Sequence, residues 1–482
     1  MSHPYLSPER LRTLVGALDS TRPTYQGLAD AIRLLVVDGR VPAGTRLPSE
    51  RDLSHALSLS RTTVAAAYAQ VRDRGYAVAR QGSGTVTVLP QDVRRGTGAA
   101  LFPAEVPDGV IDLTCAAMRA PVGTSEAYEG AVADLCGYLA GAGYVTLGVP
   151  DLRDAIAQRY AARGLPTRAE DILVTSGAVS GVAVVARALL RPGDRVLVET
   201  PTYPNTVANL RAGNARLTAV PVDADGWDLV GAASTIAAVR PVAALLIPDF
   251  HNPTGALLPD AGREVLAAAL SRAGTTAIVD ETVAELRLDE VTRPLPFAAF
   301  HPEAFLVGSA SKSLWGGLRV GWVRAPRGRM PALLAARATL DIGAPVLEQL
   351  VTLRLLHTAV DGVAVGRLAD LRAARDAAMT ALAAQLPDVR FGRPAGGMSL
   401  WLDVGGSAAR VVEAAEEAGL LVAGGSRFAV DAGYDQFLRL PYVLDPTTMT
   451  EAVSRLATAY ARVGSQGRDH ARRGRRWGPL VA

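Results

Sequence analysis

Residues 308–322 read GSASKSLWGGLRVGW and contain Lys312, the single lysine in a chain of 482 residues. Lysine and arginine together number 50, so the other 49 basic residues are arginines. Arginine can take over most surface roles of lysine, but its guanidinium group does not lose a proton and cannot form a Schiff base. A chain with this composition keeps a lysine either by chance or where an amine is required. The residues around Lys312 distinguish these two explanations.

Short apolar stretches alternate with alanine-rich helical stretches before and around Lys312. We expect strands at DILVTSG, RVLVETP, AALLIP, TAIVDE and AFLVGS. Strands that alternate with helices are typical of a parallel or mostly parallel sheet with helices on both faces. The last part of the chain, with GMSLWLDV, GLLVAGG and FLRLPYV, has the pattern of a smaller α+β unit. The sequence therefore predicts an α/β domain at 110–465, whose small C-terminal domain begins at about residue 355.

Several polar residues follow the expected strands, where loops can present them to a ligand. VTSGAVSG follows a strand and opens a helix, so the backbone amides of residues 177–179 would point at an anion. Asn252 lies in a Pro-Gly turn, and Asp280 ends a buried strand, where a carboxylate needs a partner or water. Each feature alone is more often an ordinary turn or helix cap, so only their combination argues for a site. The candidates are Gly177, Ala178, Val179, Tyr203, Asn252, Asp280, Ser309, Ser311, Lys312 and Arg319.

This combination meets the chemical needs of bound pyridoxal 5′-phosphate (PLP). An amine forms the Schiff base, and a carboxylate keeps the pyridine nitrogen protonated so that the ring accepts electrons. A helix N-terminus, hydroxyl groups and an arginine bind the phosphate, and an aromatic side chain covers the ring. The order and spacing of these residues, from about residue 110 to 465, resemble the fold-type I aminotransferases.

The resemblance implies a role for each candidate. Lys312 would be the catalytic Schiff-base lysine, Asp280 the partner of the pyridine nitrogen and Asn252 the donor to the ring hydroxyl. Tyr203 would stack on the ring. The phosphate would be bound by Gly177, Ala178, Val179, Ser309, Ser311 and Arg319.

The same resemblance implies two residues that bind a substrate or effector. Arg439 in FLRLPY matches the arginine that binds an α-carboxylate, and Tyr144 matches the tyrosine that reaches the cofactor of the partner subunit. Val283 departs from the family, because many members carry a tyrosine there that donates to the ring hydroxyl beside Asn252. Loss of that donor should raise the pKa of the Schiff base, since the bond stabilises its deprotonated form. The sequence predicts PLP binding and leaves transaminase activity open.

Residues 20–89 predict a separate DNA-binding domain. A helical stretch at 25–37 precedes LPSERDLSHALSL and SRTTVAAAYAQVRDRGY, with Ser49 and Ser60 as N-caps, and two short strands follow around a Gly-Ser-Gly turn. This order defines a winged helix-turn-helix. Residues 21–90 hold nine arginines against five acidic residues, a net charge of +4, which favours a nucleic-acid contact.

The run PAGTRLPSERDLSHALSLSRTTVAAAYAQVRDRGYAVARQGSGTV resembles the GntR family of winged-helix regulators almost from end to end. In such a domain the first turn of the third helix faces the major groove, where arginine reads guanine and hydroxyl groups bind phosphate. Ala65 departs from members that place a further arginine on this helix. The positions that match DNA contacts in the family are Arg51, Ser60, Arg61, Thr62, Thr63 and Gly82.

The remaining segments suggest connections and location. Residues 90–109 are rich in proline and glycine without a consistent period, so we expect a linker. Residues 466–482 are basic, and we expect a disordered tail. We find no export signal and no membrane span, and Cys115 and Cys136 form neither a disulfide framework nor a metal motif. We expect a cytoplasmic protein without a metal site.

A GntR-type domain joined to an aminotransferase-like domain resembles the MocR subfamily of homodimeric regulators. This resemblance implies a regulator that binds an operator with paired half-sites and senses an amine, an amino acid or PLP itself. The alternative is an active PLP-dependent aminotransferase with an attached DNA-binding module. Lys312, Asp280 and Arg439 favour it, whereas Val283 and the winged helix oppose it. A PLP-binding remnant without sensing is a third interpretation.

Overall fold

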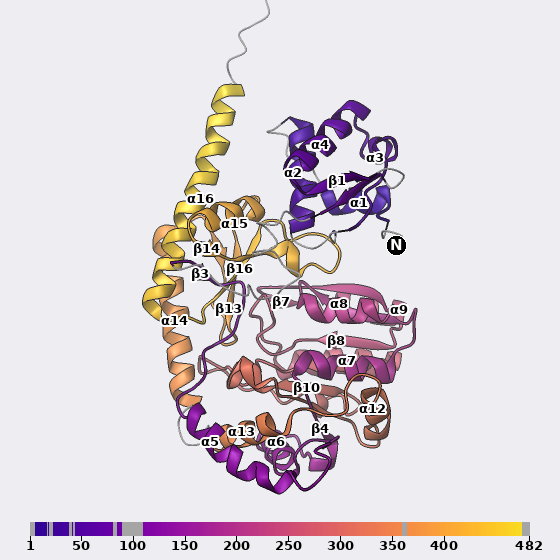
Figure 1. Ribbon diagram of the computed structural model, residues 1–482, viewed down its shortest axis with the longest axis vertical. Coiled ribbons are helices and arrows are strands. Elements are labelled where there is room, and N and C mark those ends of the chain that lie inside the picture. Colours follow the sequence, from indigo (N-terminus) through magenta and orange to yellow (C-terminus); the bar gives the residue numbers. More distant parts are fainter. Residues whose placement is uncertain are drawn as a thin grey trace, which may run out of the picture. The chain divides into compact units, whose positions relative to one another are not determined.

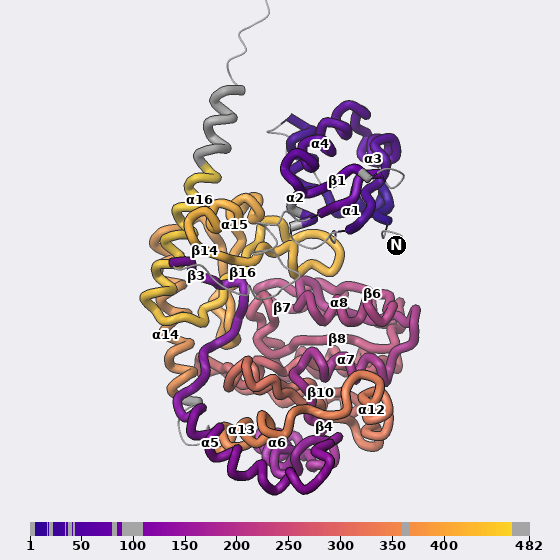
Figure 2. The backbone as a smooth tube through the Cα atoms, in the orientation of Figure 1, coloured from indigo at the N-terminus to yellow at the C-terminus, as the bar shows by residue number. Residues whose placement is uncertain are grey.

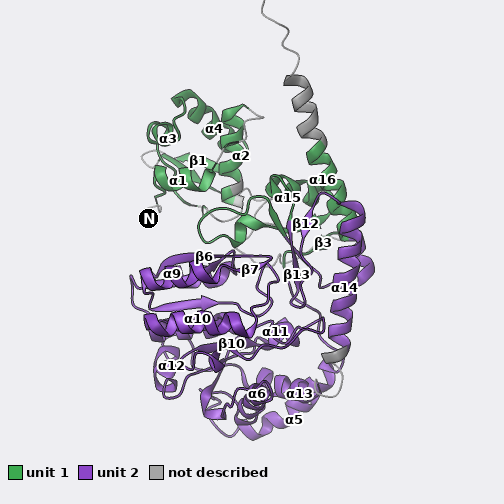
Figure 3. Ribbon diagram, turned by 180° about the vertical axis from the view of Figure 1, so that it is seen from behind, with its two compact units in different colours: residues 1–115, 403–438, 452–482 green, residues 116–402, 439–451 purple. Residues whose placement is uncertain are grey.

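The computed structural model describes residues 5–16, 18, 23–37, 41, 44–80, 84–88, 109–358 and 364–474. The chain forms two compact units, which we describe separately (Figure 3). Unit 1 comprises residues 1–115, 403–438 and 452–482, and unit 2 comprises residues 116–402 and 439–451. Across the described part of the chain, no helix is both long and apolar enough to cross a membrane.

The N-terminal part of unit 1 is a winged helix-turn-helix, which confirms the predicted fold of this domain (Figure 1). Ser49 and Ser60 cap α3 and α4 as predicted, because their hydroxyl groups accept from the amides of Asp52 and Thr63. The two strands form an antiparallel hairpin. The elements are α1 (Pro8–Val15), α2 (Thr24–Val37), α3 (Glu50–Leu57), α4 (Arg61–Asp73), β1 (Ala77–Arg80) and β2 (Gly84–Thr87).

The first helix, α1, corrects the predicted start of this domain at residue 20. Leu11 and Leu14 of α1 are buried in the same core as Leu28 and Ile32 of α2 and Val64 of α4. The sequence of α1 is a self-contained helix signal, since Ser7 caps it and Pro8 occupies its first turn. The domain therefore includes residues before position 20.

The rest of unit 1 contains short strands and helices from near both ends of the chain. β3 (Ile111–Asp112) pairs in parallel with β14 (Leu420–Leu421). α16 (Pro446–Gly474) continues to Gly474, so the disordered tail expected from residue 466 is wrong for its first part. Residues 475–482 and most of the expected linker at 90–109 lie outside the described residues. Unit 1 also contains α15 (Ala408–Glu417), β15 (Ala423–Gly424) and the first residues of β16 (Phe437–Pro441).

Unit 2 is built on an eight-stranded sheet with the order β4-β11-β10-β9-β8-β5-β6-β7. Neighbours from β10 through β9, β8 and β5 to β6 are parallel, whereas β11 is antiparallel to both β10 and β4. The mostly parallel sheet confirms the predicted fold class. The strands are β4 (Ile172–Thr175), β5 (Arg195–Thr200), β6 (Arg216–Asp223), β7 (Gly226–Trp227), β8 (Ala243–Leu246), β9 (Thr276–Asp280), β10 (Phe305–Ser309) and β11 (Gly321–Arg324).

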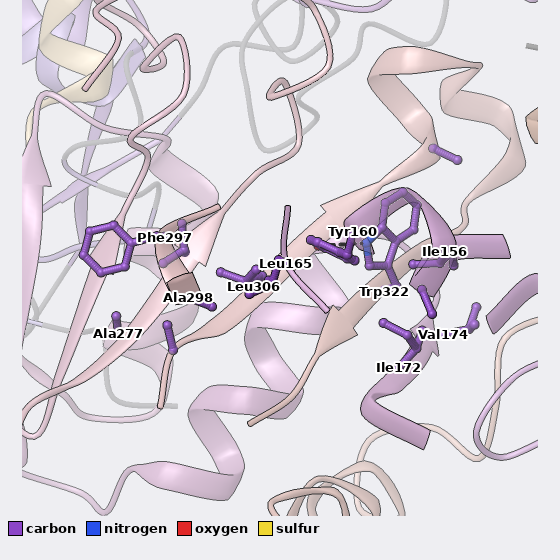
Figure 4. Packing of buried hydrophobic residues seen from close by; sticks show 14 of the residues in the cluster. Ile156, Tyr160, Leu165, Ile172, Val174, Ala277, Phe297, Ala298, Leu306 and Trp322 are labelled. Atoms are coloured by element: carbon purple, nitrogen blue, oxygen red, sulfur yellow. Dashed lines mark hydrogen bonds between the residues drawn. The ribbon is translucent and has the colours of Figure 1, made fainter. Parts of the chain in front are cut away.

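Helices connect these strands and cover the sheet, as the chain trace shows (Figure 2). Trp322 of β11 donates a hydrogen bond of 3.2 Å to the hydroxyl oxygen of Tyr160 within this core (Figure 4). Buried apolar residues from the strands and helices form one large cluster, which makes the strands a firm base for the loops at their ends. The helices are α5 (Thr124–Leu135), α6 (Pro150–Ala162), α7 (Ala178–Leu189), α8 (Pro204–Ala212), α9 (Leu229–Val239), α10 (Asp260–Ala273), α11 (Ala310–Ser313), α12 (Met330–Arg337), α13 (Val346–Thr358) and α14 (Ala364–Gln385).

The predicted small C-terminal domain, from about residue 355, does not coincide with either compact unit. α14, β12 (Arg390–Phe391) and most of β13 (Ser399–Asp403) belong to unit 2. Arg439 in β16 belongs to unit 2 as well. The residues predicted to bind the cofactor lie between positions 177 and 319, so they all belong to unit 2.

Candidate functional site

Four predicted site residues follow the carboxyl ends of neighbouring strands. Asp280 is the last residue of β9, and Lys312 lies in α11 directly after β10. Tyr203 follows β5, and Asn252 follows β8. Because β5, β8, β9 and β10 are adjacent and parallel, their carboxyl ends meet at one edge of the sheet. This edge is the usual position of ligand sites in open α/β sheets.

Lys312 is held in a short helix that begins at a capped strand end. The hydroxyl of Ser309 accepts a hydrogen bond of 3.1 Å from the amide of Ser311, which fixes the start of α11. The Nζ atom of Lys312 donates a hydrogen bond of 2.6 Å to the carbonyl oxygen of Ala116. This hydrogen bond fixes the orientation of the Lys312 side chain.

Asp280 supplies a buried carboxyl group beside Lys312. Its Oδ1 atom accepts a hydrogen bond of 2.9 Å from the amide of Thr282. Burial raises the pKa of the Asp280 carboxyl, and the nearby Glu199 adds to the rise. The hydrogen bonds from Thr282 and the charge of Lys312 act in the opposite direction. A positively charged ring nitrogen at this position would stabilise the ionised carboxylate.

The start of α7 forms a cradle with Arg319. Gly177 adopts a positive φ of 101°, and a Cβ atom there would lie 2.8 Å from Nη2 of Arg319. A Cβ atom on Gly321 would lie 2.6 Å from the backbone of Gly177, so the chain approaches here too closely for a side chain. Arg319 donates from Nη2 to the carbonyl oxygen of Ser176 at 3.3 Å. A guanidinium group beside a helix N-terminus is suited to a phosphate.

Arg439 lies next to Asn252, although 187 positions separate them in the sequence. Its Nη1 atom donates a hydrogen bond of 3.4 Å to Oδ1 of Asn252. Arg439 is 6% exposed, so its guanidinium group is well placed to attract an anion out of water. Tyr203 is half-buried, and its hydroxyl oxygen accepts from Nδ2 of Asn205 at 2.9 Å.

Tyr144 differs from the other predicted site residues in its exposure. It is 69% exposed in unit 2. Leu139 is equally exposed, and Leu340 and Ile342 are about half exposed. Val283 is buried, and as an aliphatic side chain it offers no hydrogen-bond donor.

Two further buried residues beside the site were not predicted. Glu199 is the only acidic residue within the apolar strand RVLVET, and His251 directly precedes Asn252. Both are buried, and a charged residue in a buried strand is a signal that the sequence did contain. Their partners are distant in sequence and could not be inferred from it.

The predicted DNA-binding residues gather at the starts of two helices in unit 1. Ser60 caps α4, and its Oγ lies 2.8 Å from Oγ1 of Thr62 and 2.7 Å from Oγ1 of Thr63. Arg61 opens α4 and is exposed, as is Arg51 in the first turn of α3. Gly82 lies outside the described residues. The first turn of α4 therefore presents one charged and several hydroxyl groups together.

Two family profiles match this chain. Aminotransferase class I and II matches residues 141–456, which contain every predicted cofactor-binding residue. Bacterial regulatory proteins of the gntR family match residues 24–87, the winged helix-turn-helix.

Individual relatives share one or both parts. The uncharacterized HTH-type transcriptional regulator YdfD of Bacillus subtilis is 25% identical over 453 residues, or 87% of this chain and 92% of YdfD. The probable rhizopine catabolism regulatory protein MocR of Rhizobium meliloti is 27% identical over 64% of this chain and 66% of MocR. The crystal structure of LysN, the alpha-aminoadipate aminotransferase of Thermus thermophilus complexed with N-(5′-phosphopyridoxyl)-L-leucine, is 28% identical, with a TM-score of 0.68, over 74% of this chain and 94% of LysN.

Proposed function

Because this chain belongs to the class I and II aminotransferases, within the MocR subfamily that joins such a domain to a gntR-type domain, we propose that it is a transcription regulator that senses an amino acid or amine through PLP. PLP is the cofactor of this family. The observation that carries the proposal is the position of the single lysine. Lys312 lies beside buried Asp280, in a chain that also carries a helix-turn-helix of the gntR type.

The residues at the sheet edge offer the amine, carboxyl, amide and guanidinium groups that PLP needs. When bound, PLP supplies an aldehyde that combines with amines and a ring that accepts electrons. We assign the anchoring amine to Lys312, the partner of the ring nitrogen to Asp280 and the donor to the ring hydroxyl to Asn252. Tyr203 covers the ring. The amides of Gly177, Ala178 and Val179 bind the phosphate together with Ser309, Ser311 and Arg319.

Arg439 indicates the class of effector. A buried guanidinium group beside Asn252 can bind a carboxylate through two parallel hydrogen bonds. An effector with an α-carboxylate and an amine would then contact Arg439 with one group and compete with Lys312 with the other. An effector acts only if it binds two states of the protein with different affinity.

We assign DNA binding to residues at the N-termini of α3 and α4 and to Gly82, which the sequence predicts in the wing. The residues at the helix N-termini are Arg51, Ser60, Arg61, Thr62 and Thr63. We further propose a homodimer in the cytoplasm that reads paired half-sites. The exposure of Tyr144, Leu139 and Ile342 supports a partner subunit, since large apolar side chains in water often mark an interaction surface.

A DNA-binding titration tests the proposal. The full chain is titrated onto a labelled DNA fragment from upstream of its own gene, with and without PLP, and then with a panel of amino acids and amines. We expect an amino acid to change the affinity only when PLP is bound. A Lys312→Ala variant that responds like the unchanged protein would contradict the proposal.

An active transaminase is the second candidate, supported by the presence of Lys312, Asp280 and Arg439. Buried Val283 opposes it, since valine cannot donate a hydrogen bond as a tyrosine at that position would. Single-turnover spectroscopy with the same amino acids separates the two. Rapid release of a keto acid, without specific DNA binding, would favour the enzyme.

A further inference from the structure

Glu199 is a buried carboxylate at the end of β5 that the proposed roles do not use. It is 1% exposed. Its Oε1 atom accepts a hydrogen bond of 2.6 Å from Nε1 of Trp227, and its Oε2 atom accepts one of 2.7 Å from the amide of Ile247. Each oxygen accepts a hydrogen bond, so the buried carboxyl group is held from two sides.

His251 completes the surroundings of this carboxylate. Its side chain is fully buried, and its Nε2 atom lies 3.4 Å from Oε2 of Glu199. Its Nδ1 atom lies 3.0 Å from Oγ1 of Thr254, and its ring meets Trp227 edge to face with centroids 5.8 Å apart. The approach of Nε2 to Glu199 does not have the geometry of a hydrogen bond, so His251 packs against the carboxyl group without donating to it.

These contacts connect the two loops that carry Tyr203 and Asn252. Glu199, within β5, precedes Tyr203 by four positions, while Ile247 and His251 lie between β8 and Asn252. β5 and β8 are parallel neighbours, with Val198 opposite Leu245. The Glu199 carboxylate therefore fixes the distance between the two loops at the point where they leave the sheet. It also influences the Asp280 carboxyl electrostatically.

We propose that Glu199 and His251 are positioning residues for the PLP ring, which hold Tyr203 and Asn252 in place across the gap between β5 and β8. This inference rests on the assignment of Tyr203 and Asn252 to the ring. Neither positioning residue touches the cofactor in this proposal. A role confined to the stability of the fold is the competing explanation.

The test compares PLP binding by the full chain with that of Glu199→Gln. Glutamine preserves the shape but replaces one acceptor with an amide nitrogen, so either Trp227 or Ile247 loses its partner. We expect the PLP dissociation constant to rise about tenfold or more. We also expect the visible circular dichroism of bound PLP to fall, because the ring is held less firmly. Visible circular dichroism reports the asymmetry around the cofactor, which a merely structural role would leave unchanged.

Two variants of His251 keep the test decisive if Glu199→Gln fails to fold. His251→Gln keeps a polar side chain beside Glu199, so its dissociation constant and circular dichroism should stay close to those of the protein without substitutions. His251→Leu places an apolar side chain of similar volume beside the buried carboxyl group and should behave like Glu199→Gln. Equal behaviour of the two His251 variants would overturn the role of His251.

Glu285→Gln is the control, because Glu285 is a carboxylate of unit 2 that pairs with Arg159 rather than with the loops that carry Tyr203 and Asn252. This variant should bind PLP like the unchanged protein. A Glu199→Gln variant with lower thermal stability but unchanged PLP binding and circular dichroism would reduce Glu199 to a structural role. If the protein without substitutions shows no visible absorbance band of bound PLP, the proposed function itself is contradicted.

Discussion

The amine of Lys312 donates a hydrogen bond of 2.6 Å to the carbonyl oxygen of Ala116. The two residues are 196 positions apart, so this bond brings the start of unit 2 against the helix that follows β10. A lysine that retains its charge needs such an acceptor when it is partly buried. A Schiff base at Lys312 would leave this nitrogen at most one proton, so it would have fewer hydrogen bonds to offer Ala116.

Lys312→Ala should abolish the visible absorbance of protein-bound PLP, because no other side chain of the chain can supply the amine. The helix that carries Lys312 is capped by Ser309, so the fold should survive. Absorbance spectra after removal of free PLP measure the first effect, and circular dichroism in the far ultraviolet measures the second. Arg329→Gln, which removes an exposed cation paired with Glu303, is the control and should retain the band. A band in Lys312→Ala would place the cofactor elsewhere.

Asp280→Asn should affect stability and PLP binding in opposite directions. Burial raises the pKa of Asp280 in the folded chain above its value in the unfolded chain. A carboxyl group of this kind favours folding below its unfolded pKa, and this contribution is lost as the pH rises through the folded pKa. Without PLP, the asparagine variant should therefore be at least as stable as the unchanged protein near neutral pH, and its advantage should disappear as the pH falls toward about 4.

Urea denaturation of the PLP-free proteins across this pH range measures the effect. PLP binding should weaken in Asp280→Asn by about 1.5–3 kcal/mol, the contribution of a hydrogen bond to a charged group. A variant that is less stable than the unchanged protein at neutral pH, without PLP, would contradict the sign of this prediction.

Much of the fold could be predicted because local patterns and tertiary structure agree. Each of the five expected strands is present in the sheet of unit 2. β6, β7 and β11 were missed: β7 has two residues, and β6 has a proline within it. β11 directly follows the glycine-rich turn after Lys312, so its four residues resemble a loop. The helical end of α16 was missed because the basic stretch GRDHARRG has few apolar residues to mark a helical period.

The candidate site could be predicted only as an order of residues along the chain. The strand-end positions of Asp280 and Asn252 follow from the alternation of strands and helices. The contact between Arg439 and Asn252 does not, because it depends on how β16 is placed after the chain has left the sheet. The surroundings of Glu199 could not be predicted either, since its partners are Trp227 in β7 and Ile247 directly after β8, both distant in sequence.

Arg439→Gln should separate effector binding from cofactor binding. Glutamine can still donate to Asn252 but cannot neutralise a carboxylate, so the response to amino acids should weaken by about 2 kcal/mol, or roughly 30-fold in concentration. PLP absorbance should remain. The measurement is the concentration of amino acid that half-saturates the spectral change of bound PLP. Amines without a carboxylate are the matched ligands, and their response should be unaffected. An equal loss for both ligand classes would remove Arg439 from carboxylate binding.

Arg61→Ala should weaken DNA binding more than Arg72→Ala, although both remove one positive charge from α4. Arg61 opens the helix beside the hydroxyl groups of Ser60 and Thr62, whereas Arg72 lies in its last turn. A contact with a base edge costs about 1–3 kcal/mol when it is lost and relaxes sequence preference. Loss of a general electrostatic attraction instead weakens all sequences alike and lowers the salt dependence. Titrations on specific and scrambled DNA at several salt concentrations distinguish these effects. If both variants weaken specific and scrambled DNA equally, Arg61 does not read a base, and the first turn of α4 contributes only charge.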